Sequence, residues 1–380
     1  MNFDLTEEQI AIRDAAKDFA ESEIASSSVQ RDIDGVFPFE IISKLGELGF
    51  MGMMVAPEWG GSGMDAISYV LAIEEISKVD ASVGVIMSVN NSLVCYGLEK
   101  WGSDVIKEKY LKPLASGKKL GAFCLSEPEA GSDATQQRTE AVLEGDHYVI
   151  NGMKNWITNG VNADVYFLQA MTDRSKGHKG ISTFIIDKDT PGLEVGKKED
   201  KLGIRSSDTC SLGLTDVKVP KENLLGEEGI GFKIAMSTLN GGRIGVAAQA
   251  LGIAQACLEA SVKYSKQRKA FDSTISNLQA IQFKIAEMAT NIEAARLLIY
   301  KAAQNKNEGK SYIKEASMGK LLASHAAVGS ALEAIQIHGG YGYVREYLVE
   351  RYLRDAKITQ IYEGTSEIQK IVIARELIKN

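Results

Sequence analysis

Roughly the first 120 residues alternate apolar and polar positions in the pattern of amphipathic helices. Thr6 and Gln9 fit a capping box, in which each side chain bonds the backbone N–H of the other residue at the start of a helix. Residues 65–80 and 105–115 continue the helical pattern, and APEWGGSGM, residues 56–64, is typical of a loop between helices. We therefore predict an N-terminal α-helical domain over residues 1–120.

Between residues 121 and 225 the pattern changes to short β-like runs. HYVI and MKNWI flank Asn151 and Gly152, a pair that strongly favours a two-residue hairpin turn. Further runs of strand length are DVYFLQAMT, STFIID, LEVGKK and SLGLTDVKVP. These runs predict a compact middle β domain, a barrel or sandwich over residues 121–225, inserted between helical segments.

Long helical patterns return after residue 225. Apolar residues recur every three or four positions within 280–306 and again within 313–336. Ser366 and Gln369 fit a second capping box and predict the start of a last helix. We expect a C-terminal helical-bundle domain over residues 226–380, and therefore an α protein with an inserted β domain.

The composition indicates a folded protein with small ligands. The 380 residues are 44% hydrophobic and 24% charged, which is ordinary for a globular chain. The net charge of -7, with only 43 Lys and Arg, leaves no concentrated basic face for phosphates and argues against a nucleic-acid partner.

The cysteines and the start of the chain bear on its compartment. Cys95, Cys124, Cys210 and Cys257 lie far apart without a CxxC pair, so we expect buried, reduced thiols. The first ten residues are acidic instead of basic, and no apolar run approaches the ~18 residues that span a bilayer. We expect a cytoplasmic protein without a membrane partner.

Two apparent motifs do not fit the chemistry they suggest. Residues 61–66, GSGMDA, resemble a dinucleotide fingerprint, but they lie in a helical region without the preceding strand that such a site needs. The four histidines, at 147, 178, 325 and 338, lack ligand spacing, so no metal site is predicted.

Two stretches near the domain junction suit a flat polar ligand. FCLSEPEAGSDA, residues 123–134, is either a plain connecting loop or a surface whose hydroxyls, Ser126 and Ser132, bind a ligand. Trp156 and Thr158 lie two apart in a predicted strand and should share one face. An aromatic ring beside a hydroxyl suits a planar ring system.

Two arginines have an ordinary and a functional interpretation. Arg243 lies among Gly, Ile, Val and Ala; it is either a surface cation with a buried stem or a ligand contact on a helix that its glycines leave open. Arg268 belongs to a basic cluster, KQRK, at the predicted end of a helix. Compensation of the helix dipole is the simpler explanation for such a cluster.

Glu363 is the strongest candidate for catalysis. A carboxylate ahead of a helix usually caps it, but Ser366 is available for that role. Glu363 would then be free to enter a pocket, where apolar neighbours raise the pKa of a carboxyl towards ~6 to 7, the useful range for a general base.

The chain resembles the acyl-CoA dehydrogenase family over essentially its whole length. FCLSEPEAGSDA, NGMKNWITNG, KQRKAF, EAIQIHGGYGY and RDAKITQIYEGTSEIQ occur in the order and spacing of that family, closest to its short-chain, butyryl-CoA type. The resemblance implies three domains, helical, β and four-helix bundle, in a homotetramer that holds FAD between domains and subunits.

The resemblance also implies a reaction. Glu363 would remove the pro-R α-proton of an acyl-CoA thioester while a hydride passes from the β-carbon to flavin N5. The flavin ribityl 2'-hydroxyl and the backbone N–H of Glu363 would stabilise charge on the thioester oxygen. Substitution of Glu363 should therefore abolish turnover while FAD stays bound.

The family's other contacts transfer to numbered positions by the same resemblance. The expected FAD contacts are Phe123, Leu125, Ser126, Ser132, Trp156 and Thr158 at the ring, then Arg268, Phe271, Gln279, Gln336 and Gly340 from a neighbouring subunit, and Thr365 with Glu367. The expected substrate contacts are Ser132, Asn240 and Arg243 along the CoA arm, and Tyr362 with Gly364 at the acyl pocket.

Some positions distinguish this chain within the family. Isovaleryl-type and long-chain members carry their base at the position that Gly242 occupies here. This chain has no carboxylate at that position, which leaves Glu363 as the candidate base. Asp272 replaces a common glycine, although Asp tolerates the left-handed region better than most residues. Trp156 is phenylalanine in some relatives, and His338 replaces an apolar residue; neither change removes a known chemical role.

The expected function is FAD-dependent dehydrogenation of short acyl-CoA thioesters, straight or branched, to trans-2-enoyl-CoA, with electrons passed to an electron-transfer flavoprotein. A 2-methyl-branched-chain substrate remains open because TLNGGRIG and IKEASMGKLLAS are similar to those members. An acyl-CoA oxidase fits less well, since the long C-terminal extension is missing. A catalytically silent flavoprotein scaffold is the alternative from another class, which intact Glu363 disfavours.

Overall fold

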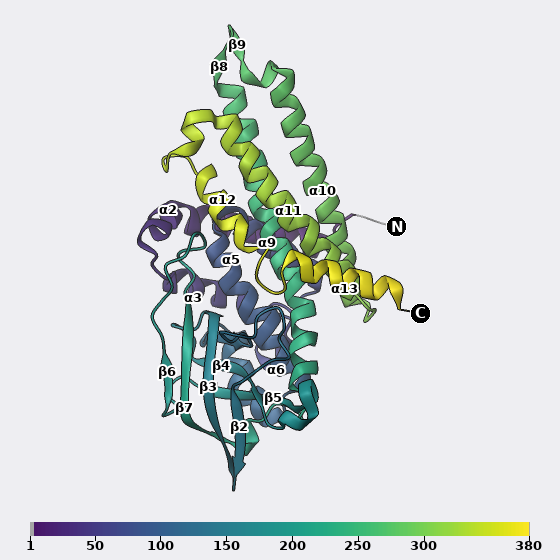
Figure 1. The fold of residues 1–380 in the computed structure, drawn as a ribbon. Helices are drawn as coiled ribbons and strands as arrows, with labels where there is room; N and C mark the ends of the chain where they lie inside the picture. The colour runs from purple at the N-terminus through teal and green to yellow at the C-terminus, as the bar shows by residue number, and fades with distance from the viewer. Residues whose placement is uncertain (1–3, 380) are drawn as a thin grey trace.

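Helices, then a sheet, then long helices follow one another in the computed structural model, which describes residues 4–379 (Figure 1). The first group comprises α1 (Glu7–Phe19), η1 (Ala20–Ile24), α2 (Ala25–Asp34), α3 (Phe39–Glu47), η2 (Phe50–Gly52), η3 (Pro57–Trp59), α4 (Ala66–Val79), α5 (Ala81–Ser88), η4 (Val89–Cys95), α6 (Tyr96–Trp101), α7 (Asp104–Ile106), η5 (Lys107–Leu111) and α8 (Lys112–Ala115). The capping box of α1 is confirmed, because the N–H of Gln9 donates to Thr6 Oγ1 at 3.2 Å and the N–H of Thr6 donates to Gln9 Oε1 at 3.0 Å. Part of the acidic start, residues 1–3, lies outside the described residues.

The middle group is a curled sheet. It consists of β1 (Gly121–Cys124), β2 (Glu140–Glu144), β3 (His147–Thr158), β4 (Val165–Met171), η6 (Arg174–Gly180), β5 (Ile181–Asp187), β6 (Leu193–Val195) and β7 (Thr209–Pro220). Within residues 4–379 its strands run in the order β1-β4-β2-β3-β7-β6, and β5 pairs with β4. The pair β1 and β4 is parallel, whereas β2 with β3 and β3 with β7 are antiparallel. The inward-facing residues, Tyr148, Ile150, Tyr166, Leu168 and Phe184 among them, form a core of their own.

The predicted hairpin at Asn151 and Gly152 is wrong. The turn between β2 and β3 lies at Gly145 and Asp146, where Gly145 has φ 65°. Asn151 and Gly152 instead lie inside β3, and the register against β7 shifts between Ile150 and Gly152. A side chain on Gly152 would begin 2.6 Å from Thr139 Oγ1, so this glycine permits close backbone approach at a bulge. Pairing with two neighbouring strands outweighs the local turn preference.

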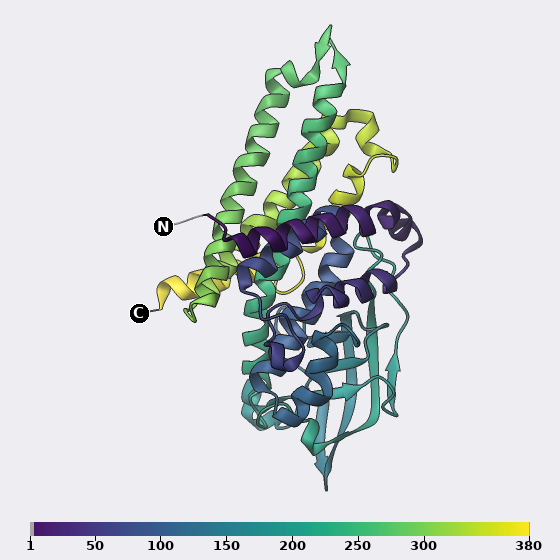
Figure 2. The ribbon, with the colours of Figure 1, turned by 180° about the vertical axis from the view of Figure 1, so that it is seen from behind.

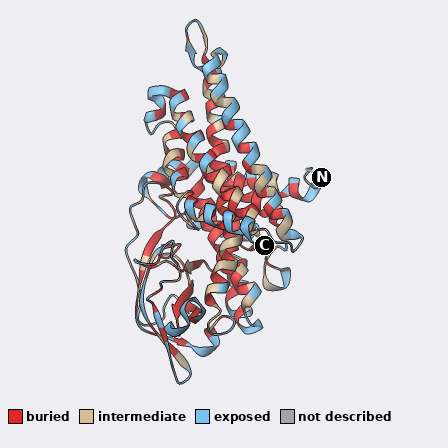
Figure 3. Ribbon diagram, turned by 45° about the vertical axis from the view of Figure 1, so that its right-hand side comes forward, coloured by how far each residue is buried: buried red, intermediate tan, exposed pale blue. Residues whose placement is uncertain are grey.

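The third group contains the longest helices. After η7 (Lys221–Asn223) come α9 (Gly231–Gln267), β8 (Lys269–Ala270), β9 (Ser273–Thr274), η8 (Ile275–Asn277), α10 (Gln279–Asn307), α11 (Ile313–His338), η9 (Gly339–Tyr343), α12 (Val349–Ile358) and α13 (Ser366–Ile378). Helix α9 extends from beside the sheet to the far tip, where β8 and β9 lie (Figures 1 and 2). Burial is concentrated where α9 passes the other helices, and the tip is more exposed (Figure 3). The expected three-part organisation is confirmed.

Two helical stretches in the described part of the chain are apolar enough on average, and long enough, to cross a bilayer. They are Ala81–Trp101 and Gly231–Gln267, and 94% and 78% of their most apolar windows are buried inside the protein. The expectation that no apolar run approaches ~18 residues is therefore wrong when mean hydropathy over an 18-residue window is the criterion. Both helices bury these windows against other elements of the protein, as core helices do, so their apolar composition is weak evidence for a membrane.

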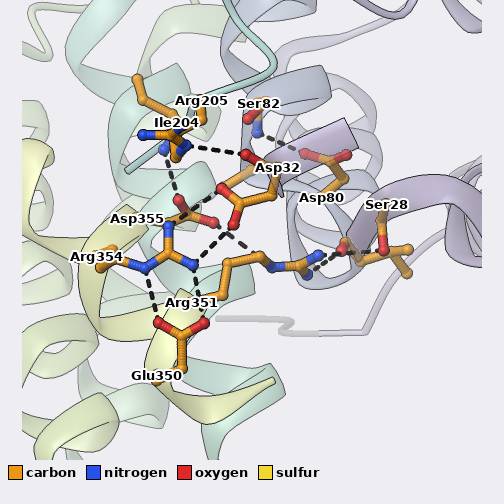
Figure 4. A network of polar contacts seen from close by, with 12 residues as sticks. Ser28, Asp32, Asp80, Ser82, Ile204, Arg205, Glu350, Arg351, Arg354 and Asp355 are labelled. Atoms are coloured by element: carbon orange, nitrogen blue, oxygen red, sulfur yellow. Dashed lines mark hydrogen bonds and ion pairs between the residues drawn. The ribbon is translucent and has the colours of Figure 1, made fainter. Parts of the chain in front are cut away.

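A polar network joins all three groups near the start of α12 (Figure 4). Arg354 of α12 donates to Asp32 of α2 at 2.7 Å and to Glu350 at 2.7 Å. The buried carboxylate of Asp355 accepts from the backbone N–H of Ile204 at 2.5 Å, in the segment between β6 and β7. Since the chain continues from α12 into residues 359–365, this network fixes where that loop begins.

We predict that Arg354→Met destabilises the protein by about 3 kcal/mol, because it leaves the largely buried carboxylate of Asp32 without its cationic partner. The thermal unfolding midpoint, measured by calorimetry, should fall by several degrees. Lys44→Met is the control: it breaks the exposed pair with Glu23 and should leave the midpoint unchanged. Equal midpoints for the two variants would contradict the interpretation.

Candidate active site

Glu363 lies in the short loop between α12 and α13, in a left-handed backbone conformation. Its φ is 51°, and that of Gly364 is 91°, a value that suits glycine. Thr365 caps α13, since its hydroxyl accepts from the N–H of Ile368 at 3.3 Å. The expectation that Ser366 caps this helix is therefore wrong by one residue, because Ser366 is its first residue. The consequence drawn from it still holds: the carboxylate of Glu363 is not needed as a cap.

Two buried donors hold the loop in this conformation. Gln369 Nε2 donates to the carbonyl of Gly364 at 2.8 Å and to that of Glu363 at 3.3 Å. Lys320 Nζ, from α11, donates to the same Gly364 oxygen at 2.6 Å. A non-glycine residue with positive φ costs of order 1–3 kcal/mol and persists only where its surroundings impose it. These bonds supply that constraint.

The carboxylate of Glu363 lies directly against the backbone of α9. A side chain on Gly242 would begin 2.0 Å from Glu363 Oε2 and 2.7 Å from Leu93 Cδ2. Oε2 is buried, and no described residue offers it a hydrogen bond. Buried polar atoms are nearly always paired, so an unpaired carboxylate oxygen marks a position held open for chemistry.

Burial raises the pKa of Glu363 to about 7, because loss of water disfavours the charged form. The positive charges of Lys320 and Arg243 act in the opposite direction and limit the rise. A carboxyl that titrates near neutral pH can accept a proton and release it again. The arrangement suits a general base.

Arg243 is buried, so of its two interpretations the surface cation is excluded. Its Nη1 donates to Asn240 Oδ1 at 2.6 Å on the same helix, and Nε is buried without a partner among the described residues. Burial lowers the pKa of Arg243, and the charge of Glu363 opposes that shift. The charge of Arg243 therefore acts on the carboxylate of Glu363, and Asn240 bonds to Arg243.

Gln249 of α9 makes a chain of hydrogen bonds that the sequence analysis missed. The Tyr362 hydroxyl donates to Gln249 Oε1, and Gln249 Nε2 donates to the carbonyl of Ala81 at 2.8 Å. A side chain on Gly245 would begin 2.5 Å from the Tyr69 hydroxyl. Gly242, Gly245 and Gln249 are spaced three and four apart, so they share one face of the helix. A single glutamine on this apolar face was the sequence signal that could have indicated a polar contact here.

The candidate residues of the middle domain form a second group. Phe123 lies in β1, and Leu125 and Ser126 directly follow that strand. The carbonyl of Ser126 accepts from the N–H of Asn155 at 2.9 Å. Trp156 has φ 60° and is 63% exposed, at a register shift in β3. Buried Ile157 separates exposed Trp156 from half-buried Thr158, and the register against β7 shifts between Lys154 and Ile157, so a bulge precedes this pair.

Lys154 anchors the loop that carries these residues. Its side chain is 0% exposed, and Nζ donates to Glu127 Oε1 at 2.7 Å, to Gln137 Oε1 at 3.2 Å and to the carbonyl of Leu125 at 3.3 Å. The other oxygen of Glu127 accepts from the N–H of Arg138 at 2.6 Å. Ser132, exposed, lies within this anchored loop.

Five further candidates lie at the opposite end of the molecule. Arg268 follows α9, and its guanidinium stacks over Tyr341 at 5.5 Å; Phe271 is 87% exposed with φ 52° in the turn between β8 and β9. A cleft of about 540 Å³ includes Arg268 and Gly340 in its lining. Gln279 begins α10, and Gln336 lies exposed near the end of α11. One chain does not bring this set to the middle domain (Figures 1 and 2).

The remaining expectations concern the last helix, metals and thiols. Thr365 and exposed Glu367 flank the start of α13, close to Glu363 in the chain. Asp272 has φ 59°, so the left-handed conformation expected there is confirmed. All four cysteines are free and buried, as predicted. Among the described residues, no group of three or more His, Cys, Asp or Glu could hold a metal ion.

Comparison with known sequences assigns each part of this fold. The N-terminal, middle and C-terminal domains of acyl-CoA dehydrogenases match residues 6–118, 122–217 and 229–378. The chain belongs to the acyl-CoA dehydrogenase family. The short-chain specific acyl-CoA dehydrogenase of mouse mitochondria is 52% identical over 99% of this chain and 92% of its own length. The short-chain specific enzyme of Megasphaera elsdenii is 51% identical over the full length of both.

Solved structures of acyl-CoA dehydrogenases match this fold throughout. Butyryl-CoA dehydrogenase from Megasphaera elsdenii has a TM-score of 0.98 at 51% identity and covers 100% of both chains. A chain from work on the electron-transferring flavoprotein of Acidaminococcus fermentans gives 0.99 at 53% identity, again over 100% of both. Glutaryl-CoA dehydrogenase in complex with glutaryl-CoA gives 0.97 at 38% identity, covering 100% of this chain and 97% of its own.

Members of this family are flavoproteins, and the residues present fit such a cofactor. The exposed indole of Trp156 offers a flat apolar surface next to the Ser126 backbone, which suits the ring system of a flavin. In the helical part, the unpaired Oε2 of Glu363 has the open partner position that a reacting group requires. An acyl-CoA dehydrogenase needs both features.

We predict that Gly242→Ala lowers acyl-CoA turnover about 100-fold, because the added methyl group occupies the position of Glu363 Oε2 and displaces the carboxylate. Steady-state rates with butyryl-CoA measure the effect. Gly241→Ala is the matched control on the same helix, since its methyl group would have only ordinary contacts at 3.8 Å. Similar rates for both variants would contradict the close approach.

Proposed function

We propose that this acyl-CoA dehydrogenase converts short-chain acyl-CoA thioesters to trans-2-enoyl-CoA, with Glu363 as the base that removes the α-proton. The observation that carries this proposal is the carboxylate itself: it is buried, has no partner for Oε2 among the described residues, and has a pKa near 7. A structural carboxylate would be paired.

Bound FAD would supply the acceptor for the hydride that leaves the β-carbon. Glu363 Oε2 would take the α-proton, and the left-handed turn holds that oxygen fixed against α9. Arg243 and Asn240 would bind the CoA arm together with Ser132, and Tyr362 with Gly364 would bound the acyl group. The backbone N–H of Glu363 would donate to the thioester oxygen, where negative charge develops.

The proposed flavin site requires more than one copy of the chain. Phe123, Leu125, Ser126, Ser132, Trp156 and Thr158 would line the ring, and Thr365 with Glu367 would contact the cofactor near α13. Arg268, Phe271, Gln279, Gln336 and Gly340 would reach the ADP half from a neighbouring subunit, which agrees with their place at the far tip (Figure 1). We infer a homotetramer, as the family resemblance implies.

The relatives of this chain support a short-chain acyl-CoA substrate and an electron-transfer flavoprotein as the electron acceptor. The chain is about 50% identical to several short-chain specific enzymes, which supports butyryl-CoA or a similar substrate. The structural match from work on an electron-transferring flavoprotein supports such a protein as electron acceptor. We propose the cytoplasm as the location. A 2-methyl-branched substrate is the second candidate, and a ladder of straight and branched acyl-CoAs would rank the two.

Anaerobic addition of butyryl-CoA should bleach the flavin absorbance of the purified protein, because the reduced flavin loses its yellow band. Glu363→Gln should keep FAD bound but lower the reduction rate by at least about 10²- to 10⁴-fold, as expected for loss of a general base. Glu308→Gln changes an exposed carboxylate at the C-terminal end of α10 and should behave as wild type. Absence of bleaching with any acyl-CoA would favour the silent scaffold.

The rate constant kcat/KM should depend on pH through Glu363. Only the ionised carboxylate can accept a proton, and its pKa is raised to about 7, so activity falls as pH drops below that value. At one pH unit below the pKa the ionised fraction is about a tenth, which predicts about a tenfold loss. A profile that is flat from pH 5 to 8 would exclude Glu363 as the titrating base.

A further inference from the structure

Lys320 is a buried lysine whose position is not explained by packing alone. It lies in the N-terminal third of α11, its side chain has no exposed surface, and its one hydrogen bond among the described residues is to the carbonyl of Gly364. Gly364 directly follows Glu363 in the chain. A fully buried ammonium group loses its hydration, which costs several kcal/mol unless charge and hydrogen bonds offset it.

The hydrogen bond does not by itself account for a charged residue. Gln369 Nε2 already donates to the same Gly364 oxygen at 2.8 Å, against 2.6 Å for Lys320 Nζ. A neutral donor therefore satisfies this carbonyl without the desolvation cost of an ammonium. What Lys320 adds is a positive charge, held on the backbone of the loop that carries Glu363.

The charges around Glu363 come from several helices. Lys320 of α11 and Arg243 of α9 are the two cations that stabilise its ionised form. The phenol of Tyr69 on α4 lies within its field, and Glu367 and Arg375 of α13 act on Lys320 and Arg243 respectively. Burial lowers the pKa of Lys320 to about 8, and Glu363 opposes that shift. The two groups therefore stabilise each other's charged forms.

We propose that Lys320 is a positioning residue for the proposed dehydrogenation: its ammonium group holds the Glu363–Gly364 turn and supplies the charge that keeps the buried carboxylate ionised. This inference rests on Glu363 being the base. Buried glutamates without a nearby cation have pKa values of ~8 to 9 and are mostly protonated at neutral pH. Lys320 thereby preserves the form of Glu363 that can accept the α-proton.

The test separates charge from hydrogen bonding. Lys320→Met removes the donor and the charge, and Lys320→Gln keeps a donor without charge. Gln369→Met removes the neutral donor from the carbonyls of Gly364 and Glu363 and leaves the charge of Lys320 in place. The protonation of Glu363 is measured in substrate-free protein by infrared titration of its carboxyl band, identified by its absence in Glu363→Gln. This readout needs no turnover.

Both Lys320 variants should raise the pKa of Glu363 by about one unit or more, since each removes a nearby opposite charge. The acid limb of kcat/KM should move by the same amount, with about a tenfold lower value at pH 6. Gln369→Met should leave the pKa unchanged, and Lys320→Arg should lie closer to wild type than Lys320→Met does.

Unchanged titration in both Lys320 variants, or an equal shift in Gln369→Met, would overturn the proposal and leave Lys320 a structural residue. If Lys320→Met does not fold, Lys320→Gln decides the matter by itself. Failure of the proposed function has a different result: wild-type protein would not be reduced by any acyl-CoA, while the infrared titration would still report on Lys320.

Discussion

The close approach of one carboxylate to one helix backbone controls the geometry of the site. Glu363 Oε2 occupies the space over Gly242 that a side chain would fill, so glycine is required there and the loop must deliver the carboxylate to that point. The left-handed turn at Glu363 and Gly364 makes this possible. The network around Arg354 and Asp355 places the start of the loop by joining α12 to the other two domains.

The same placement determines the chemistry. Burial alone would leave Glu363 protonated at neutral pH, whereas Lys320 and Arg243 together limit the rise of its pKa to about 7. A comparable arrangement occurs in the middle domain, where buried Lys154 holds the loop of Ser126 and Ser132 through Glu127. In both places a buried lysine bonds to a loop that carries candidate site residues, so each loop is fixed by charge as well as by packing.

Much of this could be predicted from the sequence. Helical and strand periodicity gave the three parts, and the capping box at Thr6 is confirmed. The runs DVYFLQAMT, STFIID and SLGLTDVKVP correspond to β4, β5 and β7. The failures were local: the turn at Asn151 and Gly152, and the cap at Ser366. At Asn151 and Gly152, pairing of β3 with both β2 and β7 outweighed a turn preference read from a few neighbours.

The sequence by itself determined the fold class, the family and the identity of Glu363 as the candidate base, because these depend on periodicity and on motifs contiguous in the chain. Tertiary structure decided the roles of Lys320, Gln249 and Lys154, which lie far in sequence from the groups they contact. It also decided that Arg243 is buried. The physical reason is that burial and electrostatic coupling depend on which helices and strands pack together, and local sequence does not specify that packing.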